Sequence, residues 1–429
     1  MHLKKFLCLF VIAMFVFALS GCGSSHSGSS FSGNTTNQNQ QNNNNGNDNQ
    51  TENNTDDTTD NTDDESTTTD ADYSSTSEGN AISYSSGTYT FNNITVTKTG
   101  DGTSSSSSEY YDWYGNNAAI LSSGTAKITI TSSNISTDAK YASAVFAYGG
   151  TINISDSTIT TLQNNSGGIM TTGGGTMTAS NLTITTSGGS SAPIRSDKGG
   201  GTVTVDGGTY TSSGTGSPAI YSTADITVTG ADLTANNSQG VVIEGANSVT
   251  LDTCNVNANH ATLNGQDTTR QAVLIYQSMS GDADEGTSAF KMTGGMIENT
   301  LGDIFCVTNT TCTINLSDVT ITNNDSSGNF LRAAHQNWGS NGGTVTLNAT
   351  NQDITGDILI DSSSSVTLNL TGSSTFTGAI NNSNSGTANV TIASGSTWTL
   401  TGNSYVTSLS NSGTINKGSY TLYVNGTAQ

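Results

Sequence analysis

The sequence predicts an all-β fold: a parallel β-helix solenoid of about twelve coils, preceded by a disordered segment. From about Gly87 onward, one pattern recurs roughly every 21–26 residues, a repeat length typical of solenoids. Within each repeat, apolar and polar residues alternate in three short stretches, which Gly, Ser and Asn separate. Alternation with a period of two predicts strands, and three short strands per repeat describe one coil of a parallel β-helix.

The composition fits this fold and excludes one class of function. The 429 residues are 32% hydrophobic and carry a formal net charge of −22. With only 11 Lys and Arg, the chain lacks the basic surface of a nucleic-acid-binding protein, so we expect no nucleic acid among its partners. Stacked coils bury a few apolar residues each in one continuous core, so a modest apolar content suffices.

The first 22 residues predict export and lipid attachment. Two lysines precede an apolar run, Phe6 to Leu19, which is too short for an ordinary membrane span and has the size of a signal peptide. The run ends in Leu19-Ser20-Gly21-Cys22, which resembles the lipobox of bacterial lipoproteins. That resemblance implies that residues 1–21 are a signal peptide and that Cys22 is acylated. A plain signal peptide with an unrelated cysteine is the alternative.

We therefore expect an exported protein, anchored to the bacterial membrane by its N-terminal lipid and displayed at the cell surface. The residue after Cys22 is Gly23 rather than Asp, which favours the outer membrane where the host has two membranes. Several acyl chains together give stable anchoring.

Residues 22–80 are predicted to be a disordered acidic tether. The segment is rich in Ser, Asn, Thr and Asp, and it contains eleven acidic residues and no Lys or Arg. Such a composition offers almost nothing apolar to bury, and its like charges repel one another.

The coils follow in order along the rest of the chain. Pairs of apolar residues predict the first strand of each coil: Ile128/Ile130, Ile152/Ile154, Val203/Val205, Ile226/Val228, Val249/Leu251, Ile314/Leu316, Val345/Leu347, Val366/Leu368 and Val390/Ile392. Single apolar residues predict the second strand: Ile135, Ile159, Ile184, Tyr210, Leu233, Val256, Ile297 and Ile321. Others predict the third: Ile120, Phe146, Ile169, Ile194, Ile220, Ile243, Ile275, Phe305 and Leu331. We assign residues 81–396 to the β-helix and 397–429 to C-terminal coils and a cap.

Three insertions interrupt the repeat: Thr262–Gln271, Ser280–Ser288 and Ala333–Gly343. Insertions in a solenoid map to loops that gather on one face, often the binding face. We expect the loop Gln277–Asp284 and the loop around Asn337 and Trp338 to wall a binding surface.

The third strands suggest where that surface lies. The residue after each inward apolar residue should point outward, because neighbours on a strand alternate faces. These residues form a predicted column: Leu121, Ala147, Met170, Arg195, Tyr221, Glu244, Tyr276, Cys306 and Arg332. Its middle is charged and aromatic, with neighbours about 5 Å apart along the solenoid.

Such a row suits a polymeric sugar, because aromatic faces stack on sugar rings and Arg pairs with uronate carboxylates. We expect the ligand to be a polysaccharide or a surface glycan. The candidate ligand-binding residues are Arg195, Asp197, Tyr221, Glu244, Tyr276, Gln277, Arg332 and Trp338. The alternative is structural: these side chains satisfy one another on a solvated sheet.

Catalysis is the second functional hypothesis. A polysaccharide lyase could use Tyr221 or Tyr276 as its base beside Arg195 or Arg332, and a glycoside hydrolase could use a carboxylate pair such as Glu244 and Asp197. No residue is assigned a catalytic role, and we expect no cofactor and no metal. A purely structural spacer is the third hypothesis.

The cysteines beyond Cys22 are odd in number. Cys254, Cys306 and Cys312 are predicted to be free, buried thiols. A pairing of Cys306 with Cys312 across one turn is the alternative.

Several phrases carry a family resemblance: Ser191-Ala192-Pro193-Ile194-Arg195-Ser196-Asp197, Gly216-Ser217-Pro218-Ala219-Ile220-Tyr221-Ser222, Val242-Ile243-Glu244-Gly245, and Tyr276-Gln277-Ser278-Met279-Ser280-Gly281-Asp282-Ala283. They resemble those of bacterial adhesin-like surface proteins with a right-handed parallel β-helix of the pectin-lyase type. The similarity covers roughly Gly87 to the C-terminus. It implies surface attachment or glycan binding, and it supplies no catalytic residues. We expect the protein to be a monomer.

Overall fold

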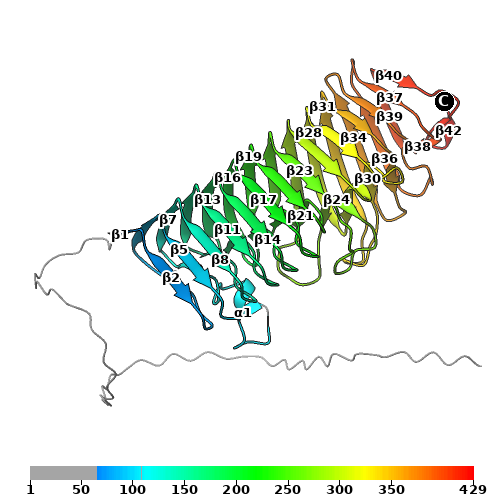
Figure 1. The fold of residues 1–429 in the computed structure, drawn as a ribbon. Coiled ribbons are helices and arrows are strands. Elements are labelled where there is room, and N and C mark those ends of the chain that lie inside the picture. The colour runs from blue at the N-terminus through cyan, green and yellow to red at the C-terminus, as the bar shows by residue number, and fades with distance from the viewer. Residues whose placement is uncertain (1–64, 108) are drawn as a thin grey trace, which may run out of the picture. The chain divides into compact units, whose positions relative to one another are not determined.

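A computed structural model describes residues 65–107 and 109–429. The predicted signal peptide, the acylated Cys22 and residues 23–64 of the predicted tether lie outside the described residues. The described chain is a parallel β-solenoid, as the sequence predicts, in which most coils contribute one strand to each of three long sheets (Figure 1). None of its helices has the length and apolar character needed to cross a membrane.

Sheet A has fourteen strands, which mark fourteen coils: β1 (Glu65–Thr69), β4 (Thr88–Asn92), β7 (Lys127–Thr131), β10 (Thr151–Ser155), β13 (Gly175–Ser180), β16 (Gly201–Asp206), β19 (Asp225–Thr229), β22 (Ser248–Asp252), β25 (Thr287–Thr293), β28 (Thr310–Ser317), β31 (Gly343–Thr350), β34 (Ser365–Thr371), β36 (Thr387–Ile392) and β39 (Ser408–Asn411). Sheet B has ten strands: β2 (Asp72–Ser75), β5 (Thr95–Lys98), β8 (Asn134–Thr137), β11 (Thr158–Thr161), β14 (Thr183–Thr186), β17 (Thr209–Ser212), β20 (Asp232–Ala235), β23 (Asn255–Ala258), β26 (Met296–Asn299) and β29 (Thr320–Asn323).

Sheet C has eleven strands: β3 (Ile82–Tyr84), β6 (Ile120–Ser123), β9 (Val145–Tyr148), β12 (Ile169–Thr172), β15 (Ile194–Ser196), β18 (Ile220–Ser222), β21 (Val241–Glu244), β24 (Gln271–Tyr276), β27 (Asp303–Thr308), β30 (Leu331–Ala333) and β33 (Ile358–Ile360). Two small sheets complete the C-terminal coils: β32 (Asp353–Thr355), β35 (Thr375–Thr377), β37 (Thr397–Thr399) and β40 (Thr414–Asn416) in sheet D, and β38 (Ser404–Val406), β41 (Leu422–Val424) and β42 (Thr427–Ala428) in sheet E.

The alternating pattern produces the core. Ile128 and Ile130 of β7 are fully buried, and they lie in register with Ile152 and Ile154 of β10 in the next coil. One apolar cluster continues in this way from Ile82 to Leu422. All the apolar residues predicted to mark the coils are buried, except Ile321, which is half-buried.

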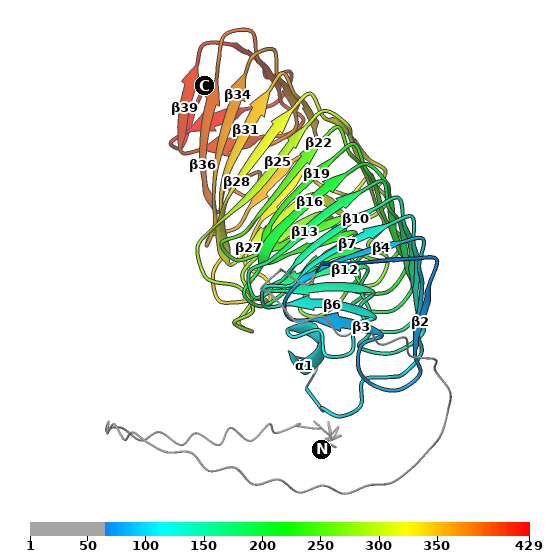
Figure 2. The same ribbon diagram turned by 90° about the vertical axis from the view of Figure 1, so that its left-hand side faces the viewer.

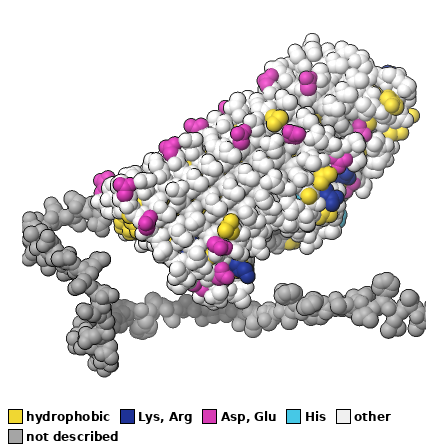
Figure 3. Space-filling model, in the orientation of Figure 1, with side chains coloured by type: hydrophobic (Ala, Val, Ile, Leu, Met, Phe, Trp, Pro, Cys, Tyr) yellow, Lys and Arg dark blue, Asp and Glu magenta, His cyan; other side chains and the backbone are white. Residues whose placement is uncertain are grey.

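The outward faces of sheets A and B are polar. Figure 3 shows few charged or hydrophobic side chains on the face toward the viewer. On sheet A, Asn348 donates a hydrogen bond of 2.9 Å to Asn315 and accepts one of 2.9 Å from Asn369. Stacked coils therefore let equivalent polar side chains pair along the solenoid.

The N-terminal boundary of the solenoid differs from the predicted one. The composition of residues 65–80 predicts a tether, but β1 and β2 form part of a first coil there and pair with β4 and β5. These sixteen residues contain one aromatic, Tyr73, which packs edge-on against Phe91, with ring centroids 5.8 Å apart. A terminal coil needs few apolar residues because the next coil covers its core, so its composition resembles that of a linker.

The C-terminal residues 397–429 complete the solenoid and close it. Trp398 is fully buried, and its indole nitrogen donates to the Gly378 carbonyl at 3.0 Å. The last pairing, between β41 and β42, is antiparallel, which breaks the parallel stacking at this end. Figure 2 shows strands of sheet A in order along the solenoid, from β4 to β39.

Candidate binding site

The outward face of sheet C is covered by loops rather than solvated. Four segments between strands lie over it: residues 99–107 with 109–119, which contain the short helix α1 (Glu109–Asp112), and loops 259–270, 277–286 and 334–342. The last three correspond to the predicted insertions. Near α1, the outward-facing Leu121, Phe146 and Met170 are buried in a second apolar cluster, so this face has a core of its own.

The register corrects the predicted column. Arg195 lies beside Tyr221, which lies beside Val242 and not beside Glu244. Glu244 lies two residues further along β21, in register with Tyr276. The longer strands β21 and β24 carry two inward apolar residues each, and the prediction counted from the second one.

One member of the predicted column faces inward. Ala147 belongs to the main core, whereas its neighbour Phe146 belongs to the outward cluster. The pattern predicts that the larger residue, Phe146, is the core residue. That reasoning fails here because both faces of sheet C are buried.

Glu244 is the centre of the site. Its side chain is 1% exposed, and its Oε2 accepts hydrogen bonds from the hydroxyls of Tyr221 at 2.6 Å and Tyr276 at 2.7 Å. The Ser278 hydroxyl donates to its Oε1. Burial, reinforced by the neighbouring carboxylate, raises the pKa of both tyrosines well above the ordinary value. Both phenols therefore remain protonated donors at neutral pH.

Arg195 is held by carboxylates of the chain itself. Its Nη2 lies 2.7 Å from Asp197 Oδ2 and 3.7 Å from Asp112 Oδ2, and its Nη1 donates to the Ser190 carbonyl at 3.0 Å. Burial raises the pKa of Asp197 to about 6, against the opposing effect of Arg195. The cluster thus contains more acidic groups than basic ones, because Glu244 lies on the same face.

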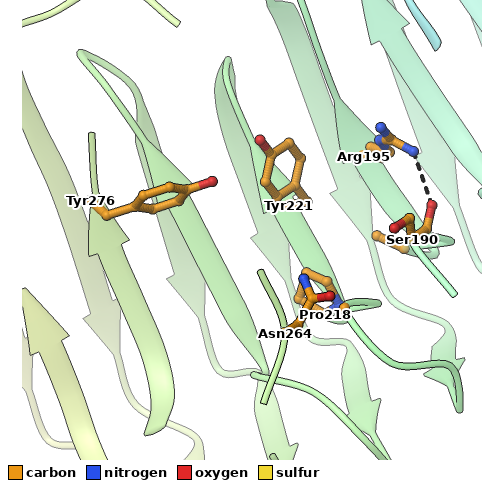
Figure 4. A pocket seen from close by; sticks show the side chains of 8 residues that line it. Ser190, Arg195, Pro218, Tyr221, Asn264 and Tyr276 are labelled. Carbon is orange, nitrogen blue, oxygen red and sulfur yellow. Dashed lines mark hydrogen bonds between the residues drawn. The ribbon is translucent and has the colours of Figure 1, made fainter. Parts of the chain in front are cut away.

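A pocket of about 190 Å³ opens between these groups (Figure 4). It is lined by Ser190, Ala192, Arg195, Gly216, Pro218, Tyr221, Asn264 and Tyr276. A branch of about 50 Å³ continues from it toward Trp338 over an apolar floor of Val242 and Leu274. In Figure 4 the two tyrosine hydroxyls point toward one another, and Asn264 lies beside Pro218.

Loop 259–270, hereafter the latch loop, forms one wall of this pocket. Asp267, at its base, accepts hydrogen bonds from the Trp338 indole nitrogen at 2.9 Å and from Gln239 Nε2 at 2.7 Å. His260 Nε2 lies 3.5 Å from the same carboxylate. Burial raises the pKa of Asp267 to about 6 and lowers that of His260 to about 4. Trp338 and Gln239, which are distant from the latch loop in sequence, thereby hold it in place.

The structure brings together only some of the predicted residues. Arg195, Tyr221 and Tyr276 line the pocket, with Glu244 behind the tyrosines and Asp197 behind Arg195. Trp338 lines the branch and packs on Tyr276, with ring centroids 4.5 Å apart.

Two predicted residues lie elsewhere. Arg332 forms an ion pair of 2.6 Å with Asp303. The Gln277 amide donates to the carbonyls of Ser278 and Ala283 within loop 277–286, and Gln277 borders a different hollow of about 570 Å³ with Met279 and Asn341.

Sequence reasoning missed three contributors: Asp112, Asn264 and Asp267. Asp112 lies in Tyr110-Tyr111-Asp112-Trp113-Tyr114, a cluster of aromatic residues that follows a Ser-rich stretch. This cluster is the sequence signal that could have pointed to the segment. The latch loop was predicted as an insertion, but no pattern within it distinguishes Asn264 or Asp267 from other loop residues.

The remaining chemistry is limited. Cys254, Cys306 and Cys312 are free and buried, as predicted. Within residues 65–107 and 109–429, no group of three or more His, Cys, Asp or Glu side chains is arranged to hold a metal ion.

In comparisons with known proteins, no family model, curated protein or solved structure matches this chain.

Proposed function

We propose that the chain is a lipid-anchored surface protein that binds glycans through the pocket on the outward face of sheet C. In this proposal Cys22 carries the lipid, and the solenoid is a right-handed β-helix of the pectin-lyase type, adhesin-like in role. The observation that carries the binding proposal is the lining itself: two tyrosines, an arginine and an asparagine around a small pocket. Small-molecule sites combine aromatic walls with a few placed polar groups in this way.

The lining offers hydrogen bonds that match sugar hydroxyls. The oxygens of Tyr221 and Tyr276 donate their protons to Glu244 and keep lone pairs that can accept. The Asn264 amide can both donate and accept. A sugar hydroxyl also donates and accepts, so both its donor and its acceptor function can find a partner in the pocket.

The alternative of a lyase or hydrolase receives less support. A base must lose its proton near the working pH, whereas burial raises the pKa of both tyrosines. Glu244 is occupied by three hydroxyl donors, and Asp197 lies behind Arg195. These groups are arranged to hold one another in place, which suits a binding site.

A glycan and polysaccharide array with residues 23–429 tests the proposal. The array is read for retained binding and for new unsaturated or reducing ends. We expect binding without product, and we expect Asn264→Ala to weaken it. The matched control is Asn153→Ala, because Asn153 is exposed on sheet A, away from the pocket. Products would overturn the proposal in favour of an enzyme, and binding to no glycan would overturn it outright.

A further inference from the structure

We infer that the pocket takes the terminal residue of an uncharged glycan and excludes internal sugar residues and acidic sugars. This inference rests on the proposed function and names its ligand class. The sequence predicted an open row of side chains for a polymeric sugar, including uronates. The closure, size and charge of the pocket indicate a different ligand.

The latch loop forms one wall of the pocket and makes two contacts across the outward face of sheet C. In the first, a Cβ atom added to Gly216 would come within 2.5 Å of Asn264 Nδ2, so the Asn264 amide rests on the Gly216 backbone. In the second, a Cβ atom added to Gly265, the next residue of the loop, would come within 2.8 Å of the Trp338 ring. A sugar chain cannot continue through this wall, so a ligand must enter the pocket by its end.

The size of the pocket agrees with entry by one residue. Its volume is about 190 Å³, with about 50 Å³ more in the branch. Pockets for drug-sized ligands have roughly 300–1,000 Å³, so this one suits a single ring. The apolar floor of the branch, Val242 and Leu274, can hold an apolar substituent such as an acetamido methyl group.

Charge excludes acidic sugars. Arg195 is the cationic residue of the lining, and Asp197 and Asp112 already pair with it. The nearby Lys198 donates to the Gly281 carbonyl at 2.7 Å and lies 4.9 Å from the Trp113 ring centre. An incoming carboxylate would find Arg195 already paired. Asp112, Asp197 and Glu244 lie directly behind the lining, and like charges at this range repel.

A set of matched sugars tests the inference on residues 23–429. The probes are methyl glycosides of glucose, galactose, mannose, N-acetylglucosamine and glucuronic acid, together with oligosaccharides that carry each sugar at the non-reducing end or internally. We expect one neutral methyl glycoside to compete with the bound glycan. We expect binding to weaken at least tenfold when one further sugar residue is attached to the non-reducing end of the bound glycan. We expect the same loss when the terminal sugar is oxidised to the uronate.

Two variants connect this selectivity to the latch loop. Asn264→Ala should weaken terminal-sugar binding about three- to tenfold, the effect of one hydrogen bond. Trp338→Ala removes a bond to Asp267, and it should narrow the difference between terminal and internal residues. Thermal unfolding of each variant shows that the solenoid is intact.

The outcomes separate the two proposals. Equal binding of internal or acidic residues, without competition by any methyl glycoside, would overturn the inference and leave glycan binding standing. Binding of no probe and of no glycan on the array would overturn the proposed function, and the inference with it.

Discussion

Tyr276 and Glu244 lie in register on neighbouring strands of sheet C, and the tyrosine hydroxyl donates to the carboxylate at 2.7 Å. Both side chains point away from the main core, and both are at least 96% buried. A buried carboxylate is tolerated only where hydrogen bonds replace its water, and here three hydroxyls do so. The site is therefore a polar network enclosed by loops.

The first prediction concerns this network. Tyr276→Phe removes one of the two donors to Glu244 Oε2 and should lower the free energy of unfolding by about 1–3 kcal/mol. Urea denaturation measures the change. Tyr405→Phe is the matched control, because Tyr405 stacks on Tyr423 at the C-terminal end with no partner for its hydroxyl among the hydrogen bonds of the described chain. It should change stability by less than about 0.5 kcal/mol. Equal effects would contradict the assigned role of Tyr276.

The second prediction is a pH dependence at the latch loop. Burial raises the pKa of Asp267 to about 6, so the folded chain keeps this proton from about pH 4 to 6, where an unfolded aspartate has lost it. The carboxyl is thus neutral below about pH 6 and charged above it. The neutral form accepts more weakly from the Trp338 indole N–H, so the environment of the indole changes with this proton.

Tryptophan fluorescence between pH 4 and 8 measures this change in a Trp113→Phe background. Of the two remaining tryptophans, Trp398 is fully buried in the core and supplies a constant signal. We expect a transition with a midpoint near pH 6 that disappears in Asp267→Asn and persists in Asp197→Asn. A transition retained in Asp267→Asn would show that another group titrates there.

The third prediction separates latch-loop position from backbone strain. Gly216 and Gly230 both have positive φ values, 64° and 62°, a conformation that costs other residues roughly 1–2 kcal/mol. An added Cβ meets the Asn264 amide only at Gly216, since Gly230 has nothing within 4 Å. The backbone strain caused by Gly216→Ala and by Gly230→Ala should therefore be similar.

Only Gly216→Ala should disturb the latch loop. Hydrogen exchange of residues 259–270 measures this, and we expect faster exchange in Gly216→Ala and unchanged exchange in Gly230→Ala. Gly216→Ala should also lower the affinity of the pocket for its ligand. Unchanged exchange in both would show that Asn264 does not depend on its contact with Gly216.

The fold could be predicted because each coil repeats the same physical requirement. Alternating residues such as Ile128 and Ile130 have one face to bury, and the adjacent coil buries it. The site could be predicted only in part, because the outward face of sheet C does not follow the same rule. Loops cover this face, so Phe146 is buried although it faces outward. Glu244 lies in register with Tyr276 rather than with Tyr221, and the spacing of apolar residues in the sequence did not reveal this register.

The charge balance of the site was also beyond the sequence pattern. Arg195 and Asp112 are distant in the chain, and α1 brings the carboxylate to the guanidinium. No periodicity links a loop residue to a strand residue several coils away. Insertions can be located from a broken repeat, but the partners of their side chains depend on how each loop folds over the sheet.

The last prediction concerns the first coil. A chain that begins at residue 81 lacks β1 and β2, and it exposes Phe91 and Val96, which are 2% and 0% exposed in the complete solenoid. Exposing one such side chain costs about 1.5–3 kcal/mol, so residues 81–429 should melt at least about 3 °C below residues 65–429. Thermal unfolding of the two chains measures the difference. The control is residues 23–429, which should melt with residues 65–429, because the first coil is present in both. Equal melting of the 65–429 and 81–429 chains would show that the solenoid begins at the boundary that composition suggested.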